Sequence, residues 1–175
     1  MKTRWRASKG FTLLELIVVV CIVALLATAL LSRVWFYQEQ AEKTAMVEVA
    51  GVIQSELLMR YGQMMIHGAE AQIPALATDN PMSWLAKAPR NYAGEFFASE
   101  PGALVPGSWV FDLKSHELIY TLDRTDFFVP ASDGKKWIRY RVKLMYEPFP
   151  GVPAEAQKRL AGVLFEPVEP YKWLE

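Results

Sequence analysis

Hydrophobic residues along this chain follow three successive patterns, and each pattern predicts a different element. From Phe11 to Leu31 almost every position is apolar, and Glu15 is the only charged residue in these 21 positions. As an α-helix the run would extend about 31 Å at 1.5 Å per residue, close to the roughly 30 Å hydrocarbon thickness of a bilayer. We therefore expect residues 11–33 to form a membrane-spanning helix.

The second pattern has the spacing of an amphipathic helix. No proline interrupts residues 34–62, and apolar residues recur at every fourth position, at Ala41, Ala45, Val49 and Ile53, with Val52 on the same side. Two acid-first pairs at the i, i+4 spacing support a helix, namely Glu39 with Lys43 and Glu56 with Arg60. One helix is therefore predicted over residues 11–62, with its first half facing lipid and its second half packed on a head.

Residues 63–108 are rich in proline and glycine, which predicts a connecting loop region. One short helix is expected inside it, where Asp79 or Asn80 can cap and Pro81 suits the first helical position.

The third pattern is strict alternation, which is typical of strands. Strands are predicted at residues 108–113, 117–122, 135–147 and 162–166. In the longest, Ile138, Tyr140, Val142, Leu144 and Tyr146 share one face, and Trp137, Arg139, Arg141 and Lys143 share the other. Residues 109–175 should therefore form an antiparallel head of three or four strands with one buried face. The fold class is α+β, with the second half of the long helix covering this small sheet.

Charge indicates how the spanning segment is oriented. The first ten residues hold four cations and no acid, whereas the rest of the chain holds 15 basic and 19 acidic residues, a net charge of −4. Trp35, Phe36 and Tyr37 follow the apolar run and suit a membrane interface. By the positive-inside rule the N-terminus stays cytoplasmic and the head is periplasmic, attached to a bacterial inner membrane by a single pass.

Three interpretations of the N-terminal segment compete. A cleaved secretory signal would use the small-x-small pattern at Ala27-Thr28-Ala29, but it gives no reason for Glu15. A plain uncleaved anchor would tolerate Glu15 near the headgroups. In the third, cleavage between Gly10 and Phe11 creates a free amine that Glu15 of a neighbouring subunit neutralises, because an uncompensated carboxylate within a membrane is costly.

The stretch KGFTLLELIVV, residues 9–19, resembles the N-terminal signature of type IV prepilins and of the pseudopilins of type II secretion. The resemblance implies a pilin-like fold, cleavage after Gly10, N-methylation of Phe11 by a prepilin peptidase, and an assembly role for Glu15. It also implies filament partners of the same kind, an inner-membrane platform protein and a cytoplasmic ATPase. Many relatives carry a proline about twenty residues into the mature helix, whereas the first proline here is Pro74.

The sequence gives little indication of a catalytic or metal-binding site in the head. His67 and His116 lack a partner at metal-binding spacing, and the only cysteine, Cys21, lies in the apolar run. Asp123, Asp126 and Asp133 do not follow an EF-hand spacing, so turn formation is favoured over a calcium site. We expect no catalytic residue, no metal and no cofactor.

The basic row on the longest strand allows two interpretations. A cationic stripe beside an aromatic residue can bind DNA, but the polar face of a half-buried strand needs no such function. The predicted function is therefore a structural subunit of a type IV pilus or of a secretion pseudopilus, without enzymatic activity. The alternative is an uncleaved single-pass inner-membrane protein with an external binding domain. With one cysteine the chain cannot form a disulfide loop, which favours a pseudopilin or minor pilin over a major pilin.

Overall fold

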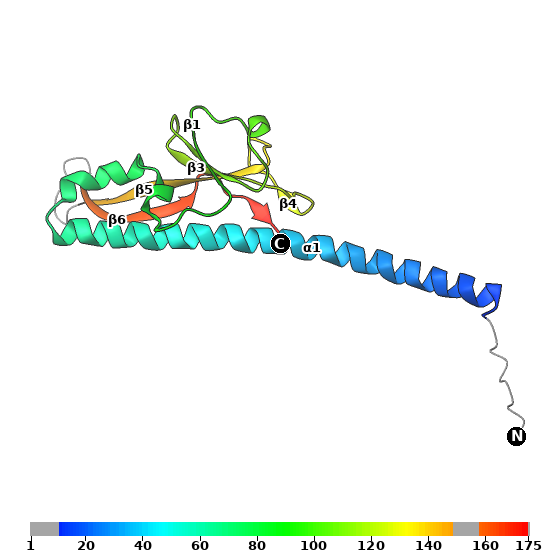
Figure 1. Ribbon diagram of the computed structural model, residues 1–175. Coiled ribbons are helices and arrows are strands. Elements are labelled where there is room, and N and C mark those ends of the chain that lie inside the picture. The colour runs from blue at the N-terminus through cyan, green and yellow to red at the C-terminus, as the bar shows by residue number, and fades with distance from the viewer. Residues whose placement is uncertain (1–10, 149–157, 175) are drawn as a thin grey trace, which may run out of the picture. The chain divides into compact units, whose positions relative to one another are not determined.

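The structure is a computed structural model that describes residues 11–148 and 158–174. The chain divides into two compact units, Met1–Gln38 and Glu39–Glu175. One helix, α1, covers Leu13–Ile66 and contributes to both units (Figure 1). The strands of the described residues all belong to the second unit, which has a sheet and its own core. The predicted α+β class with a long N-terminal helix is confirmed.

Helix α1 ends four residues later than predicted, and the reason is a capping motif. Gly68 adopts a φ of 67°, the left-handed conformation that favours glycine. The Ala69 N–H donates to the Met64 carbonyl at 2.8 Å, and the Gly68 N–H donates to Met65 at 3.4 Å. These two bonds are those of a Schellman motif. Gly62, where the prediction stopped, lies within the helix.

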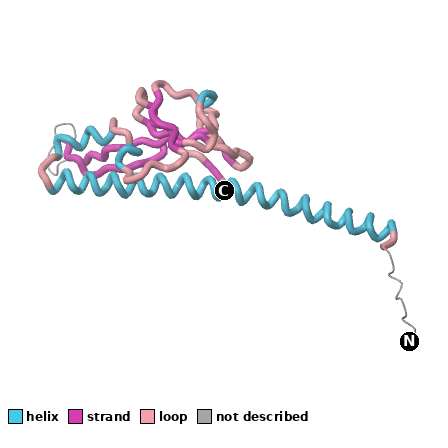
Figure 2. The backbone as a smooth tube through the Cα atoms, in the orientation of Figure 1, coloured by secondary structure: helices cyan, strands magenta, loops and turns pink. Residues whose placement is uncertain are grey.

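The head contains a five-stranded sheet in the order β1-β2-β3-β5-β6. Figure 2 draws the strands of the head in magenta. Its strands are β1 (Tyr92–Phe96), β2 (Trp109–Asp112), β3 (Glu117–Thr121), β5 (Trp137–Pro148) and β6 (Lys158–Pro167). A separate two-stranded sheet pairs β4 (Phe128–Val129) with β7 (Lys172–Trp173). Three 3₁₀ helices, η1 (Glu70–Ala77), η2 (Pro81–Trp84) and η3 (Pro101–Ala103), lie in the segment between α1 and β2. Asn80 caps η2 by accepting the Met82 N–H at 2.9 Å, which confirms the predicted short helix.

The sheet is mixed, which corrects the prediction of a purely antiparallel one. Strand β1 pairs with β2 in parallel, and it lies inside residues 63–108, where a connecting loop with one short helix but no strand was predicted. Its sequence YAGEF does not alternate, and its register shifts between Tyr92 and Glu95, around Gly94 at a φ of 106°. A bulged edge strand of this kind has no period-2 pattern to recognise.

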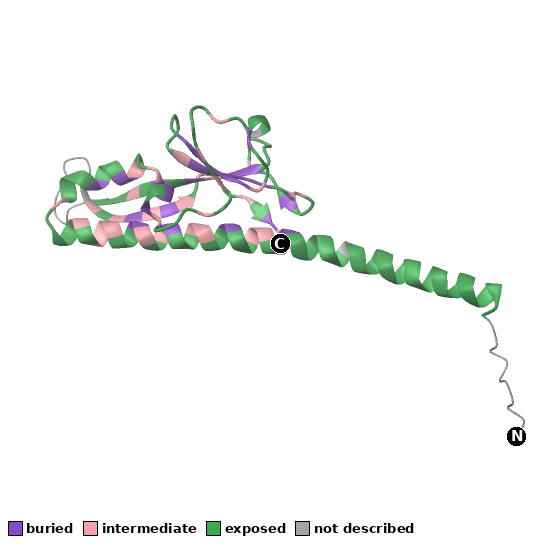
Figure 3. Cartoon of the chain, viewed as in Figure 1, coloured by how far each residue is buried: buried purple, intermediate pink, exposed green. Residues whose placement is uncertain are grey.

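Within the second unit, α1 lies along one face of the large sheet and closes the main core (Figure 3). The α1 residues in that core are Met46, Ile53 and Leu57, packed with Trp109, Phe111, Tyr120, Tyr140 and others from the strands. The predicted helix face was therefore partly wrong. Val49 and Ile53 contribute, but Ala41, Ala45 and Val52 are exposed. The i, i+4 spacing in the sequence pointed to a face that includes two alanines. The face that is buried carries larger side chains, which remove more apolar area from water.

A second apolar cluster lies on the other face of the sheet. It contains Leu104, Val110, Ile119 and Trp137. Residues 109 and 111 of β2 face the main core, so Val110 between them faces away from it. Trp137, predicted to lie on a polar face, is only 8% exposed. The sheet therefore buries residues on both faces, because the segment containing Leu104 covers this end of its outer face.

Polar side chains of α1 bind the head instead of pairing along the helix. Glu42 accepts the N–H groups of Asp123 and Arg124 at 2.8 and 3.0 Å. Gln54 accepts the Phe165 N–H of edge strand β6 at 2.6 Å. Among the described residues no ion pair joins the predicted partners Glu39 and Lys43, which both contact Trp173 instead.

The predicted pair of Glu56 with Arg60 is likewise not formed within the described residues. The Arg60 guanidinium instead lies 5.6 Å from the centroid of the Trp84 ring, at cation–π distance.

Candidate functional site

The N-terminal candidate site begins at the start of α1. Thr12 precedes the helix, and its Oγ1 accepts the Glu15 N–H at 3.2 Å while its carbonyl accepts the Leu16 N–H. Thr12 is thus the N-cap and Glu15 the N3 residue of a T-x-x-E sequence, the pattern of a capping box. The sequence signal was available but was not used in the prediction.

Glu15 therefore sits where an acid is also favourable for the helix itself, because helix N-termini carry a partial positive charge. Its side chain is exposed, and Phe11 is 73% exposed. Gly10, the predicted cleavage position, lies outside the described residues. The site thus consists of an uncovered acid four residues beyond an uncovered phenylalanine, and both can be reached by another molecule.

No other described residue covers the apolar part of α1. Its side chains between Leu13 and Leu31 are exposed, so it is not the core helix of a soluble domain. By length and composition α1 is the one helix of the described residues that could cross a membrane. Thr28 donates its hydroxyl to the Ala24 carbonyl at 2.9 Å, which satisfies a polar group inside this segment. The helix continues without a break through residue 32.

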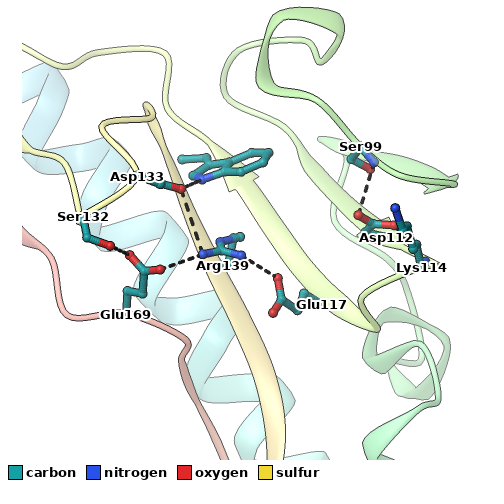
Figure 4. Close-up of polar contacts among 9 residues, drawn as sticks. Ser99, Asp112, Lys114, Glu117, Ser132, Asp133, Arg139 and Glu169 are labelled. Carbon is teal, nitrogen blue, oxygen red and sulfur yellow. Dashed lines mark hydrogen bonds and ion pairs between the residues drawn. The ribbon is translucent and has the colours of Figure 1, made fainter.

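In the head, the predicted basic row is largely neutralised (Figure 4). Arg139 pairs with Glu169 at 2.9 Å and Glu117 at 3.3 Å, and it lies 4.0 Å from Asp133. Lys143 pairs with Glu166 at 2.8 Å. Arg141 is exposed and makes no ion pair with a described residue. The row therefore offers less positive charge for binding phosphates than its sequence implies.

Asp133 belongs to this ion-pair group and stabilises a turn. Partial burial alone would raise its pKa, but hydrogen bonds from the Lys135 N–H and the Trp137 indole, together with the charge of Arg139, lower the pKa from its ordinary value. The Asp133 carboxylate accepts the Trp137 indole N–H at 2.7 Å. Within residues 11–148 and 158–174, no three His, Cys, Asp or Glu side chains form a group that could hold a metal ion.

The two histidines occupy different surroundings. His67 is exposed just after α1. His116 adopts a φ of 55° in the turn between β2 and β3, with Nδ1 3.1 Å from the Thr78 carbonyl oxygen. His116 is thus a turn residue that contacts the η1 segment, a structural contact that the sequence did not reveal.

Comparison with known proteins gives a match in the N-terminal segment. Residues 5–31 match the prokaryotic N-terminal methylation motif, which supports the resemblance to type IV prepilins. No curated protein and no solved structure matches the chain. The matched residues include Gly10, Phe11, Glu15 and most of the apolar run, and the match does not extend into the head.

Proposed function

We propose that this chain is a non-enzymatic structural subunit of a type IV pilus-like or type II secretion pseudopilus filament. A prepilin peptidase would cleave after Gly10 and methylate Phe11. An inner-membrane platform protein and a cytoplasmic ATPase would then drive its assembly, with the apolar half of α1 moving from lipid into the filament. A single pass of the inner membrane, with a periplasmic head, precedes assembly.

The observation that carries this proposal is the combination of the methylation motif with an uncovered apolar helix. Residues 5–31 match the motif, and the helix they begin exposes its apolar side chains over Leu13–Leu31. A bilayer and a filament core are two environments that can cover such a helix in turn. The presence of one cysteine, Cys21, excludes an intrachain disulfide and favours a pseudopilin or minor pilin.

Processing provides the first test. When the full chain is coexpressed with a prepilin peptidase, it should lose ten residues and begin at a methylated Phe11, as measured by intact mass. A Gly10→Val variant is the matched control and should remain uncut, because a side chain before the scissile bond blocks close approach of the enzyme. A full-length wild-type product would favour the uncleaved anchor, and a product beginning at Leu30 would establish a secretory signal.

Glu15 provides the second test. A Glu15→Leu change makes the span more compatible with lipid, so a plain anchor should insert at least as well as before. In a filament it leaves a neighbour's Phe11 amine without a counter-charge, and an uncompensated buried charge typically costs roughly 3 to 5 kcal/mol. We expect normal cleavage and a sharp loss from the sheared filament fraction.

The capping box requires a control for this second test. Thr12→Val removes the N-cap hydroxyl but keeps the acid, and the loss of a cap typically costs about 1 kcal/mol. If Glu15 acts only through capping, Thr12→Val should be the more severe change and Glu15→Gln should assemble nearly normally, because glutamine also completes a capping box. If it neutralises an amine, Glu15→Gln should be much the more severe of the two.

A further inference from the structure

A short loop after β1 presents an aromatic side chain to solvent. Phe97 is 75% exposed, and its neighbour Phe96 is 43% exposed. Phe96 lies beside Asp112 of β2, and its carbonyl accepts the Leu113 N–H at 2.8 Å. Single exposed apolar residues are common on proteins, so exposure alone does not indicate a binding surface.

The backbone around Phe97 is held in place by a buried acid. Asp112 is 7% exposed, and its carboxylate accepts the N–H groups of Ala98 at 3.0 Å, Ser99 at 3.2 Å and Lys114 at 2.9 Å. Figure 4 shows Asp112 beside Ser99 and Lys114. Ala98 adopts a φ of 54°, which residues other than glycine seldom do. Strained backbone fixed by a dedicated buried group is typical of functional loops. Phe97 is thus presented from a preorganised loop.

A complementary surface exists elsewhere on the head. A shallow groove of about 500 Å³ is lined by residues 129–132 and 170–172, including Val129, Pro130, Ser132, Pro170 and Tyr171. The two prolines and the β4–β7 pairing limit its backbone freedom, so the groove exists before any ligand binds. Its lining is mostly apolar and its volume exceeds that of a phenylalanine side chain.

The aromatic loop and the groove lie at opposite ends of the β2–β3 pair. Phe97 adjoins the end where Asp112 pairs with Glu117. The opposite end, where Trp109 pairs with Tyr120, leads through Thr121 to the segment that carries β4. A contact between the loop of one copy and the groove of another would join unlike surfaces. Such heterologous contacts do not close on themselves and can generate filaments.

We infer that Phe97 of one subunit inserts into the groove between Pro130 and Pro170 of a second copy of this chain. This inference rests on the proposed filament function and names a head-to-head contact within it. Charge favours the same pairing. Glu95 and Glu100 flank the aromatic loop, whereas Lys172 lines the groove. Opposite charges at the rim fix the register of an interface whose centre is apolar.

Cysteine crosslinking of the full chain tests the contact. In a Cys21→Ala background, the Phe97→Cys/Val129→Cys pair is expressed with a prepilin peptidase and a pilus-type assembly apparatus, and sheared filaments are treated with a short bis-maleimide. Because each copy carries both cysteines, the expected product is a ladder of covalent multimers. Either single variant should give no ladder. Val105→Cys with Val129→Cys is the matched control, because Val105 is 66% exposed but lies outside both surfaces.

Each result has a defined meaning. The contact would be overturned if the Phe97→Cys/Val129→Cys protein is present in the sheared filaments but gives no ladder, or if the control pair gives an equal ladder. In either case the filament function would still stand. Absence of the Cys21→Ala parent from the sheared fraction would overturn the filament function and the contact with it.

A second variant measures the energetic role of Phe97. Truncation of a central aromatic residue typically weakens an interface roughly tenfold or more. Phe97→Ala should therefore reduce incorporation into filaments, whereas Phe97→Tyr should restore it, and neither change should lower the melting temperature of the detergent-solubilised chain. Full incorporation of Phe97→Ala would contradict the inference.

Discussion

Acidic side chains in this protein bind backbone N–H groups of distant segments. Glu39 is fully buried, and its Oε1 accepts the Trp173 indole N–H at 2.8 Å and the Phe127 N–H at 3.1 Å. Its other oxygen, Oε2, is buried without a hydrogen-bond partner among the described residues. Glu39 therefore attaches the C-terminal strand to α1, at a cost in desolvation that its two donors offset.

Substitutions at Glu39 should separate hydrogen bonding from charge. Glu39→Ala removes the acceptor of the buried Trp173 indole N–H and of the partly buried Phe127 N–H. It should cost about 2 to 4 kcal/mol of unfolding free energy, since a buried donor that loses its acceptor costs roughly 1 to 3 kcal/mol and a partly buried one costs less. Glu39→Gln keeps the accepting oxygen and removes the buried charge, so it should cost less than half as much. Urea unfolding of the full chain in detergent, followed by tryptophan fluorescence, measures both. Glu48→Ala, at an exposed position of the same helix, is the control. Equal losses for Ala and Gln would contradict the hydrogen-bond explanation.

At the scale of elements, the second half of α1 serves as the cover of the sheet. Its Met46, Ile53 and Leu57 complete the main core, and Gln54 protects the outer edge of β6 by accepting the Phe165 N–H. An unpaired edge group would otherwise be available for pairing with another strand. The helix thus supplies both apolar area and edge protection to the head.

Two truncations test this dependence. A chain starting at residue 35 keeps the covering half of α1 and should be soluble, monomeric and cooperative in thermal unfolding. A chain starting at residue 63 exposes the apolar sheet face around Trp109 and Tyr140 and should aggregate. Size-exclusion chromatography and thermal denaturation compare the two. Equal solubility and equal cooperativity would mean that the sheet does not need the helix.

At the scale of the whole molecule, the two units have opposite relations to their surroundings. The unit Glu39–Glu175 buries its own core, whereas the apolar residues of Met1–Gln38 that the structure describes are exposed. The proposed filament function uses both properties. The first unit needs lipid or neighbouring helices, and the second can fold in water.

The proposed topology predicts a pattern of thiol labelling. In a Cys21→Ala background without prepilin peptidase, Val105→Cys should react with a membrane-impermeant maleimide once the outer membrane is permeabilised. Ser8→Cys should react only after lysis, because the basic first ten residues keep that end cytoplasmic. Gel-shift labelling of the two variants measures this. The reverse pattern would contradict a periplasmic head.

Local patterns were sufficient for much of this protein. Near-continuous apolarity predicted the N-terminal half of α1, and period-2 alternation predicted β2, β3 and the long strand β5. The methylation motif is also local, since its cleavage position and its acid lie within a few residues of each other. Such features can be recognised in sequence because neighbours along the chain specify them.

Tertiary contacts decided the rest. Residues Ala45 and Met46 are adjacent and both suit a helix, and only the sheet determines that Met46 is buried. The edge strand β1 has no alternating sequence pattern, so it depends on contacts from other parts of the chain. It pairs with β2, and the Asn80 side chain donates hydrogen bonds to Tyr92 and Glu95. The sequence predicts Arg139 on a solvated polar face, whereas the fold places Glu117 and Glu169 beside it as ion-pair partners. Partners this far apart in sequence meet only through folding, so the helix and strands were predictable, whereas their buried faces and ion pairs were not.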